Sequence, residues 1–403
     1  MCPNRLHIEI AEVVRRGNCS GCGACALLDQ DVVLELADDG FIRPRIGVSG
    51  PSEADPTALT EFRQSCPGVS VQAQNPAGAT RHDFLGPVVS IWEAYALDKD
   101  IRFRGSSGGT LTALNEWLLA SGQIDSVVVA AASESSPEKT ESSAVRTRSD
   151  IVRATGSRYA PTANAAAADV DNPASAVVGK PCEISALRAL AKSRDQRSPL
   201  LLSFFCAGVP SQHATNSLIH ELGVDDGADL AALRYRGHGW PGDFYVEDTR
   251  GNSARTSYDV SWGQHLGPAV QQRCKLCPDG VGESADISAG DFWRADSDGY
   301  PDFTDQDGLS VLIARTRRGE EIIRRAAEEG VIAVRAIDPD AVAAVQPFQV
   351  VRRATLLGRM VGSRLAGHPT PRYRGFRLRR LSMRSPLRTL RAMAGTFRRA
   401  RRW

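Results

Sequence analysis

The sequence predicts an α/β protein with a mixed-sheet core, preceded by a small cysteine-bearing unit and followed by a basic tail. Three observations predict this organisation. Short apolar runs alternate with helical patterns in the middle of the chain, three cysteines crowd together near the N-terminus, and arginines dominate the C-terminal end. Alternation of this kind favours a sheet covered by helices. We therefore expect three units, at residues 1–80, 81–350 and 351–403.

The core is predicted from the length and periodicity of its apolar runs. Strands are expected at residues 126–132, 142–148, 175–179, 200–205, 285–289 and 309–315. Helices are expected at residues 107–120, 183–193, 210–222 and 318–329. In open sheets of this class, ligands collect beyond the carboxyl ends of the strands. Residues that directly follow a strand are therefore candidates for a site.

The amino-acid composition indicates which classes of protein the chain can belong to. The chain has 403 residues, of which 42% are hydrophobic, and this suits two or three globular domains. The sequence has neither an apolar run of membrane-spanning length nor the apolar segment of a signal peptide. We therefore expect a cytoplasmic protein. Its nine cysteines are too few for a disulfide scaffold, and clustered cysteines in that compartment are more often metal ligands or redox groups.

The first cysteine group is a C-x2-C-x2-C run formed by Cys19, Cys22 and Cys25. Two-residue spacers let three thiolates converge from one loop, and the small residues between them leave room for a cluster. Cys66 precedes a proline, as the remote cysteine of bacterial ferredoxins does, and is the candidate fourth ligand. The group therefore predicts a [4Fe–4S] cluster in a ferredoxin-like domain at residues 1–80. The alternatives are a zinc site, which more often uses paired C-x2-C knuckles, and a purely structural role.

A second group is predicted from cysteines that are distant in sequence. Cys182 and Cys206 each follow an apolar run of strand type, and Cys274 and Cys277 form a C-x2-C pair. Two cysteines at neighbouring strand ends would lie close together, so the four make a candidate cage for a second cluster. The alternative is that the isolated cysteines are small core residues. Cys2 has no evident partner.

Glycine-rich loops indicate an anion site in the core. Residues 104–110, Arg-Gly-Ser-Ser-Gly-Gly-Thr, open into a helical pattern, and free N–H groups at a helix start attract phosphate. An ordinary capping loop would look similar. Arg158 could pair with phosphate and Tyr159 could stack on a ring, although both would also suit an ordinary loop. Lys180 follows a predicted strand and could stabilise a reduced flavin, whereas a solvated surface lysine is the commoner case.

Taken in order, these motifs resemble one family, the coenzyme F420 hydrogenase/dehydrogenase beta-subunit family, over about residues 15 to 350. The motifs are Cys19-x2-Cys22-x2-Cys25, Arg104-Gly-Ser-Ser-Gly-Gly, Gly156-Ser-Arg-Tyr, Gly179-Lys-Pro-Cys182, Phe205-Cys206-Ala-Gly-Val-Pro210, Gly237-His-Gly-Trp240, Cys274-x2-Cys277-Pro and Ala285-Asp-Ile-Ser-Ala-Gly-Asp-Phe-Trp293.

The resemblance implies an oxidoreductase with FAD and one or two [4Fe–4S] clusters that exchanges hydride at the flavin. It places Ser107, Gly108, Gly109 and Thr110 along the flavin site, with Arg158, Tyr159 and Lys180 near it. The expected route leads from a donor such as ferredoxin through the first and second clusters to FAD and a small-molecule substrate, or in reverse. Coenzyme F420 is one candidate substrate.

Two other classes of function compete with this interpretation. A non-catalytic electron-transfer subunit would carry the same clusters but would hand its electrons to a partner enzyme. A zinc-binding interaction protein would bind neither sulfide nor flavin. Catalytic side chains are not identified by any motif in the sequence.

The C-terminal segment differs in charge from the rest of the chain. Residues 352–403 contain 16 arginines and no acidic residue, and because the whole chain carries +2, residues 1–351 carry about −14. Leu387, Leu390, Ala394 and Phe397 recur at helical spacing. A basic amphipathic helix can lie on an anionic membrane or dock on an acidic partner, of which the acidic body of this chain is one candidate, and a disordered tail is the simpler alternative. No motif indicates specific nucleic-acid binding.

Overall fold

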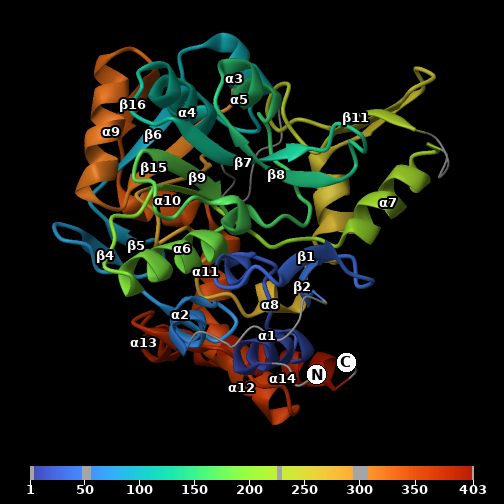
Figure 1. Ribbon diagram of the computed structural model, residues 1–403, viewed down its shortest axis with the longest axis vertical. Coiled ribbons are helices and arrows are strands. Elements are labelled where there is room, and N and C mark those ends of the chain that lie inside the picture. The colour runs from blue at the N-terminus through green and yellow to red at the C-terminus, as the bar shows by residue number, and fades with distance from the viewer. Residues whose placement is uncertain (1–3, 48–55, 225–228, 294–306, 402–403) are drawn as a thin grey trace.

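The computed structural model describes residues 4–47, 56–224, 229–293 and 307–401, so Cys2 lies outside the described residues. Its centre is an eight-stranded mixed sheet in the order β16-β6-β15-β14-β10-β9-β7-β8 (Figure 1). Four neighbouring strands, β14, β10, β9 and β7, run parallel to one another, whereas the strands on either side of them pair antiparallel. The sheet consists of β16 (Ile332–Ala336), β6 (Ser90–Ala96), β15 (Ser310–Ala314), β14 (Ile287–Asp291), β10 (Leu200–Phe204), β9 (Ser175–Gly179), β7 (Ser126–Ala132) and β8 (Thr140–Val145). The prediction of an α/β protein with a mixed sheet is confirmed.

Helices cover both faces of the sheet, and this explains why its middle strands are apolar throughout. Side chains alternate along each strand, so Val127 and Val129 face one layer and Val128 faces the other. On the first side lie α4 (Thr110–Ala120) and α9 (Arg317–Glu328). On the second side lies α6 (Pro181–Ser193), together with the loop that carries Cys22.

The parallel strands bring distant residues to one edge of the sheet. The register sets Ser203 of β10 opposite Gly179 of β9 and Ser288 of β14. The carboxyl ends of these three strands therefore meet, and the chain continues from them into Lys180, Cys206 and Phe292. This is the edge at which ligands bind in open α/β sheets.

The N-terminal unit is a small layer around the first cysteine group. It comprises α1 (Arg5–Arg15), the 3-10 helix η1 (Ala24–Leu27), the hairpin β1 (Val32–Leu36) and β2 (Ile42–Ile46), and α2 (Pro56–Ser65). Leu6, Ile10 and Phe62 form its core, against which three of the cysteines pack. An ion pair of 2.9 Å between Arg194 and Glu61 links α6 to α2. That this unit is a ferredoxin-like domain stays a prediction.

An outer arm projects beside the sheet (Figure 1). The sequence patterns predicted its helix at residues 210–222 but not its strands. It contains α7 (Gln212–Glu221), the three-stranded sheet of β11 (Leu230–Arg234), β12 (Phe244–Asp248) and β13 (Ser253–Thr256), and the π-helix η3 (Asp259–Leu266). Tyr235, Phe244 and Leu266 are buried in its own apolar core. Shorter elements connect the layers: β4 (Thr80–His82), β5 (Gly86–Val88), α3 (Lys99–Arg104), α5 (Arg148–Arg153), η2 (Asn164–Ala167), α8 (Gln272–Lys275) and α10 (Pro339–Ala344).

The arginine-rich C-terminal segment is folded onto the rest of the protein, which corrects the expectation of a separate tail. It forms α11 (Pro347–Ala354), α12 (Leu356–Leu365), β17 (Arg372–Arg374), α13 (Leu378–Met383) and α14 (Pro386–Ala400). β17 pairs in parallel with β3 (Ser70–Gln72) of the N-terminal unit. Arg352 and Arg353 are each only 4% exposed, because their guanidinium groups have partners inside the core. No helix in the described part of the chain is both long and apolar enough to cross a membrane.

Candidate functional site

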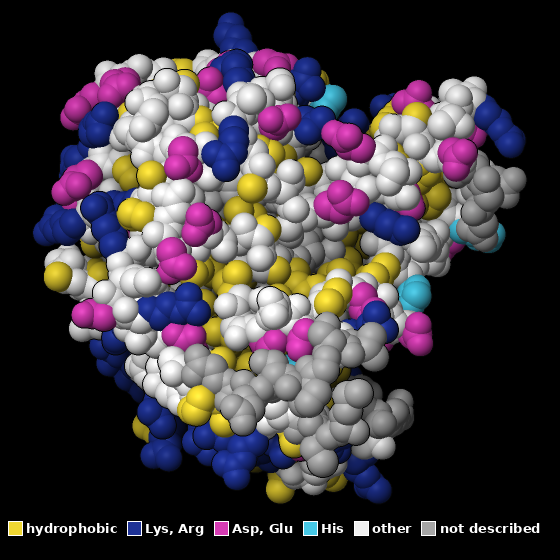
Figure 2. Space-filling model, viewed as in Figure 1, with side chains coloured by type: hydrophobic (Ala, Val, Ile, Leu, Met, Phe, Trp, Pro, Cys, Tyr) yellow, Lys and Arg dark blue, Asp and Glu magenta, His cyan; other side chains and the backbone are white. Residues whose placement is uncertain are grey.

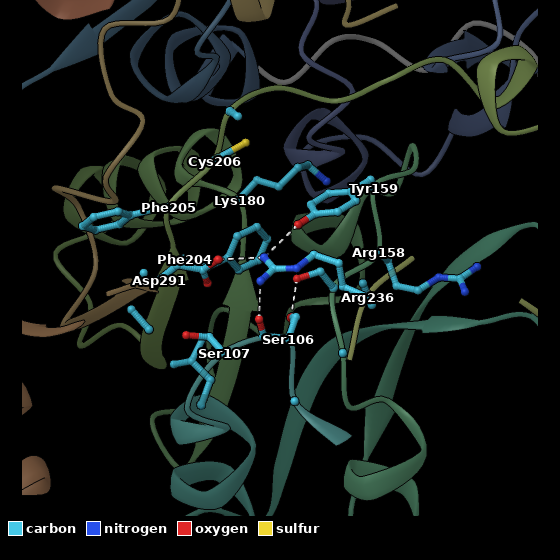
Figure 3. A pocket seen from close by; sticks show the side chains of 18 of the residues that line it. Ser106, Ser107, Arg158, Tyr159, Lys180, Phe204, Phe205, Cys206, Arg236 and Asp291 are labelled. Atoms are coloured by element: carbon cyan, nitrogen blue, oxygen red, sulfur yellow. Dashed lines mark hydrogen bonds and ion pairs between the residues drawn. The ribbon is translucent and has the colours of Figure 1, made fainter. Parts of the chain in front are cut away.

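A cavity of about 530 Å³ lies at the carboxyl edge of the parallel strands (Figure 3). Its wall is built from the glycine-rich loop before α4, the loop at residues 156–160, the ends of β10 and β14, and residues 346–349. A cavity of this size falls within the range of about 300–1,000 Å³ that is typical of ligand pockets. Segments from all parts of the core therefore converge on one site.

The glycine-rich loop presents its backbone to this cavity. Ser107, Gly109 and Thr110 line the cavity, and no side chain caps the start of α4. Gly109 has a φ of +71°, in the region that favours glycine. Gly108 faces the sheet instead: its N–H donates to Ser310 Oγ at 3.0 Å, and a Cβ there would lie 2.6 Å from the carbonyl oxygen of Ala94. Gly108 is therefore a packing residue beside the site.

Arg236 is the cation at the centre of the cavity wall. Its Nη1 lies 2.7 Å from Asp291 Oδ2 and 3.3 Å from the Tyr159 hydroxyl, and its Nη2 donates to the Ser106 carbonyl at 2.6 Å (Figure 3). Its Nε donates to the Pro241 carbonyl at 2.8 Å. Although burial alone would lower the pKa of Arg236, the Asp291 carboxylate outweighs burial and raises it. Arg236 therefore stays charged and ties four separate segments together.

Arg158 lines the cavity, but its guanidinium group points away from the centre of the cavity (Figure 3). Its guanidinium donates to Thr140 Oγ1 at 3.0 Å and to the carbonyls of Pro137, Lys139 and Leu233 at 2.7–3.0 Å. In Figure 3 its side chain points away from Arg236 and the centre of the cavity. Burial lowers its pKa. In this structure the Arg158 guanidinium binds the Thr140 hydroxyl and three loop carbonyls, and its expected pairing with phosphate stays a prediction.

Tyr159 lies in the cavity wall as part of an aromatic cluster. Its ring centroid is 4.9 Å from that of Trp262 and 5.9 Å from that of Tyr235. Trp262 and Tyr258 also line the cavity. The site therefore offers an aromatic wall on the side of the outer arm, in addition to the polar glycine-rich loop.

Lys180 is buried, and its charge is paired. Nζ lies 2.6 Å from Glu183 Oε1 and 2.9 Å from the Thr162 carbonyl, with exposed side-chain fractions of 7% for Lys180 and 0% for Glu183. Burial acts to lower the pKa of Lys180, but the Glu183 carboxylate outweighs it and raises the pKa. Lys180 lines the cavity and is therefore a fixed positive charge, in contrast to a solvated surface lysine.

The first cysteine group is brought together. Cys19, Cys22, Cys25 and Cys66 all line one small cavity of about 30 Å³. Burial raises the pKa of the Cys22 thiol to about 11, and burial and then the neighbouring cysteines raise the pKa values of Cys25 and Cys66. The Gly21 N–H lies 3.4 Å from Cys19 Sγ and donates to it. Four buried thiolates would repel one another, so the arrangement favours a bound cationic group.

The second cysteine group converges around the end of β10. After burial, the nearby Cys274 and Cys277 raise the pKa of the Cys206 thiol, and Cys206 raises that of Cys182. Burial raises the pKa of the Cys206 thiol to about 12. The Val209 N–H donates to Cys274 Sγ at 3.4 Å. All four are free thiols in the structure, and no three His, Cys, Asp or Glu side chains of the described ranges form a site for a single metal ion.

The two cysteine groups and the large cavity adjoin one another. Cys22 of the first group and Cys182 of the second belong to the same apolar cluster against α6. Cys206 of the second group lines the large cavity, and Figure 3 shows it beside Phe205 and Lys180. A continuous path therefore runs from the N-terminal unit to the cavity.

Two buried arginines accompany the second group. Arg352 Nη2 donates to the Cys206 carbonyl at 3.0 Å and to Gln349 Oε1 at 2.5 Å. Arg273 Nη2 donates to the Pro67 carbonyl at 2.9 Å, and its Nε has no hydrogen-bond partner among the described residues. Their exposed fractions are 4% and 2%, and within the described ranges neither forms an ion pair with a carboxylate. Buried cations of this kind need nearby negative charge, which thiolates would supply.

Several site residues escaped the sequence reasoning. Arg236 directly precedes the Gly237-His-Gly-Trp240 turn, and Asp291 lies within Gly290-Asp-Phe-Trp293. The default role of such glycine–aromatic turns is packing. Their charged members could have been weighed as site residues, but the pairing between them depends on the tertiary fold.

Comparison with known proteins identifies relatives of this chain. The family described as the C-terminal part of the coenzyme F420 hydrogenase/dehydrogenase beta subunit matches residues 174–340, and its counterpart for the N-terminal part matches residues 91–168. Together the two matches cover more than half of the chain.

Individual relatives agree with this result. Coenzyme F420 hydrogenase subunit beta from Methanococcus voltae is 27% identical over 257 residues, which are 61% of this chain and 83% of the relative. The coenzyme F420-dependent sulfite reductase of Methanocaldococcus jannaschii is 23% identical over 78% of this chain. The match spans about half (47%) of that longer protein. A chain of the F420-reducing [NiFe] hydrogenase complex from Methanosarcina barkeri shares the fold, with a TM-score of 0.50 and 24% identity over 69% of this chain and 96% of that chain.

Proposed function

Since the chain belongs to the coenzyme F420 hydrogenase/dehydrogenase beta subunit family, we propose that it is an iron–sulfur flavoprotein oxidoreductase. It would pass electrons between two [4Fe–4S] clusters and FAD and exchange hydride with a small molecule. The observation that carries the proposal is the contiguity of the sites: Cys22 and Cys182 share one apolar cluster, and Cys206 lines the large cavity.

The first cysteine group fits a [4Fe–4S] cluster by the chemistry of its donors. Cys19, Cys22, Cys25 and Cys66 line one cavity in a small apolar core. A four-iron cluster is bound by four thiolates, so its ligands are arranged differently from those of a single metal ion. The Gly21 N–H at Cys19 Sγ is a hydrogen bond of the kind that tunes cluster potentials. The small N-terminal unit would act as a ferredoxin-like domain that receives electrons.

The second group would hold a second cluster between the first group and the cavity. Cys182 and Cys206 follow the adjacent parallel strands β9 and β10, and Cys274 and Cys277 approach from α8. Arg352 and Arg273 would compensate the negative charge of four thiolates, because they are buried beside the group without a carboxylate partner in the described chain. A buried positive charge favours the reduced, more negative cluster and therefore raises its reduction potential.

The large cavity would hold the FAD, since its size is typical of ligand pockets and its polar groups suit a pyrophosphate. The glycine-rich loop and the uncapped start of α4, with Thr110 among the lining residues, would face the pyrophosphate. Arg236 would hold the loop through the Ser106 carbonyl, Tyr159 would form the apolar wall, and Lys180 would supply a fixed positive charge. When bound, a flavin links single-electron transfer to the exchange of hydride with a substrate.

The substrate class rests on the relatives alone. The names of the relatives specify coenzyme F420, which makes F420 the first small molecule to test here. Residues 346–349 also line the cavity, and we assign the substrate to their side of it. Ferredoxin is the first electron donor to test, because the first cysteine group lies in the N-terminal unit, away from the cavity.

The proposal is tested by following flavin absorbance while reduced ferredoxin is mixed with protein purified without oxygen. The wild-type flavin should bleach. Cys25→Ser should bind flavin but lose bleaching by ferredoxin, whereas Cys2→Ser, which removes a cysteine outside both groups, should behave as wild type. Bleaching at an unchanged rate in Cys25→Ser would exclude the first group from the route.

A second candidate, a non-catalytic electron-transfer subunit, is favoured by one observation. The curated relatives from Methanococcus voltae and Methanosarcina barkeri are themselves named subunits of a larger hydrogenase. The two functions differ in a simple assay, because an enzyme reduces F420 when supplied with reduced ferredoxin alone, whereas a subunit needs its partner.

A further inference from the structure

The corner where α13 meets α14 is an exposed surface that combines apolar and basic side chains. Met383, Leu387 and Leu390 are 76%, 70% and 54% exposed. Figure 2 shows basic side chains gathered at the end of the molecule where Figure 1 places α12–α14. The corner, named here the α13–α14 corner, consists of Arg379, Met383, Leu387, Arg388, Leu390 and Arg391, all of which are exposed.

The apolar residues of the corner point away from the protein because the other side of α14 packs against α12. A Cβ at Gly358 would collide with the backbone of Thr389, and one at Gly362 would collide with the backbone of Met393. These close contacts fix which face of α14 is buried. Leu387 and Leu390 are left on the outer face, although helical spacing groups them with Phe397 as one amphipathic stripe.

The charge of the corner is not neutralised by the protein. Residues 352–403 contain no acidic residue. In the described chain Asp83 is the acidic partner of α13, and it pairs with Arg377 just before the helix, Arg380 within it and Arg384 directly after Met383. Arg379, Arg388 and Arg391 form no ion pair with a described residue.

We propose that the α13–α14 corner docks this protein on an anionic lipid membrane surface. The leucines and the methionine would enter the boundary between headgroups and acyl chains while the arginines contact lipid phosphates. Nucleic acid would satisfy the arginines but offers no apolar phase for three side chains that are more than half exposed. An acidic protein would need a matching apolar patch for a convex helical corner, whereas a membrane supplies both properties at once.

Vesicle flotation tests the proposal on the full, cofactor-loaded chain. Wild type should float with vesicles of equal parts phosphatidylglycerol and phosphatidylcholine and not with phosphatidylcholine alone. Leu387→Ser with Leu390→Ser should lower the vesicle partition coefficient about tenfold or more, and Arg388→Gln with Arg391→Gln should lower it about fivefold per arginine. The matched control, Leu97→Ser with Arg255→Gln, removes an exposed leucine and an exposed arginine elsewhere and should float as wild type.

The possible results of the flotation experiment distinguish a membrane from other partners of the α13–α14 corner. Absence of wild-type flotation at low salt would overturn the proposal, as would flotation that survives both corner variants. Flotation that is unchanged by the leucine variant but abolished by about 1 M NaCl, where the Debye length is about 3 Å, would also overturn it, because a purely ionic surface would suit an acidic protein or nucleic acid equally. An unchanged visible spectrum of each variant confirms that the redox centres are intact.

Discussion

Replacing Arg236 with methionine tests whether the cavity wall depends on one buried ion pair. Arg236 is 3% exposed, its Nη1 lies 2.7 Å from Asp291 Oδ2, and its guanidinium also reaches two carbonyls. Removing one partner of a buried pair typically costs about 3–5 kcal/mol, because the other charge remains buried. The Asp291 side chain is 24% exposed, so water relieves part of this penalty. We therefore expect a loss near the lower end, about 3 kcal/mol.

The assay is urea unfolding of protein purified without oxygen, followed by tryptophan fluorescence, with flavin affinity measured alongside. Arg236→Met should lower the free energy of unfolding and weaken flavin binding together. Adding Asp291→Asn should recover part of the stability, because it removes the unpaired carboxylate, but should leave flavin binding weak. Arg236→Lys, which keeps the charge but not the fork of donors, should lie between wild type and Arg236→Met. A loss below about 1 kcal/mol, the value of an exposed pair, would refute the reasoning.

Three further predictions follow from buried or shared charges. Arg352→Gln should make the reduction potential of the second cluster more negative in an EPR-monitored redox titration, and an unchanged potential would show that this arginine only packs. Lys180→Met should destabilise the protein by about 3–5 kcal/mol in urea, and adding Glu183→Gln should restore much of the loss. Although burial acts to raise the pKa of Asp83, its arginine partners outweigh burial and lower it. Its contribution is therefore present at neutral pH and is lost as pH falls through that depressed pKa, so limited proteolysis of the C-terminal helices should increase in acid, and much less so in Asp83→Asn.

Six of the eight strands of the central sheet followed from the sequence because they carry a clear apolar signal, whereas β6 and β16 were not predicted. Residues 126–132 and 175–179 are apolar on both faces, as buried parallel strands are, and the structure has β7 and β9 over the same ranges. The helix of the outer arm was predicted at residues 210–222, but its strands were missed because they are short and pack against the arm's own helices. The local pattern of apolar and polar residues does not identify the short strands of such a unit.

The candidate site was predictable where spacing alone sets the geometry. The run from Cys19 to Cys25 must converge, since its spacers are two residues long. The placement of Arg158 was not predictable, because the choice between phosphate and backbone carbonyls depends on Pro137 and Leu233, which are distant in sequence. Contact between the arginine-rich segment and the acidic body was one of the expected alternatives, but a count of charges does not show that Arg352 and Arg353 have buried partners.

The central claim is most directly tested by iron, sulfide and flavin analysis of the protein purified without oxygen. The account predicts about eight irons with matching sulfide and one FAD per chain, with iron falling by about half in Cys25→Ser. About four irons with FAD would contradict the role given to Cys182, Cys206, Cys274 and Cys277. Zinc without sulfide or flavin would contradict the proposed function as a whole.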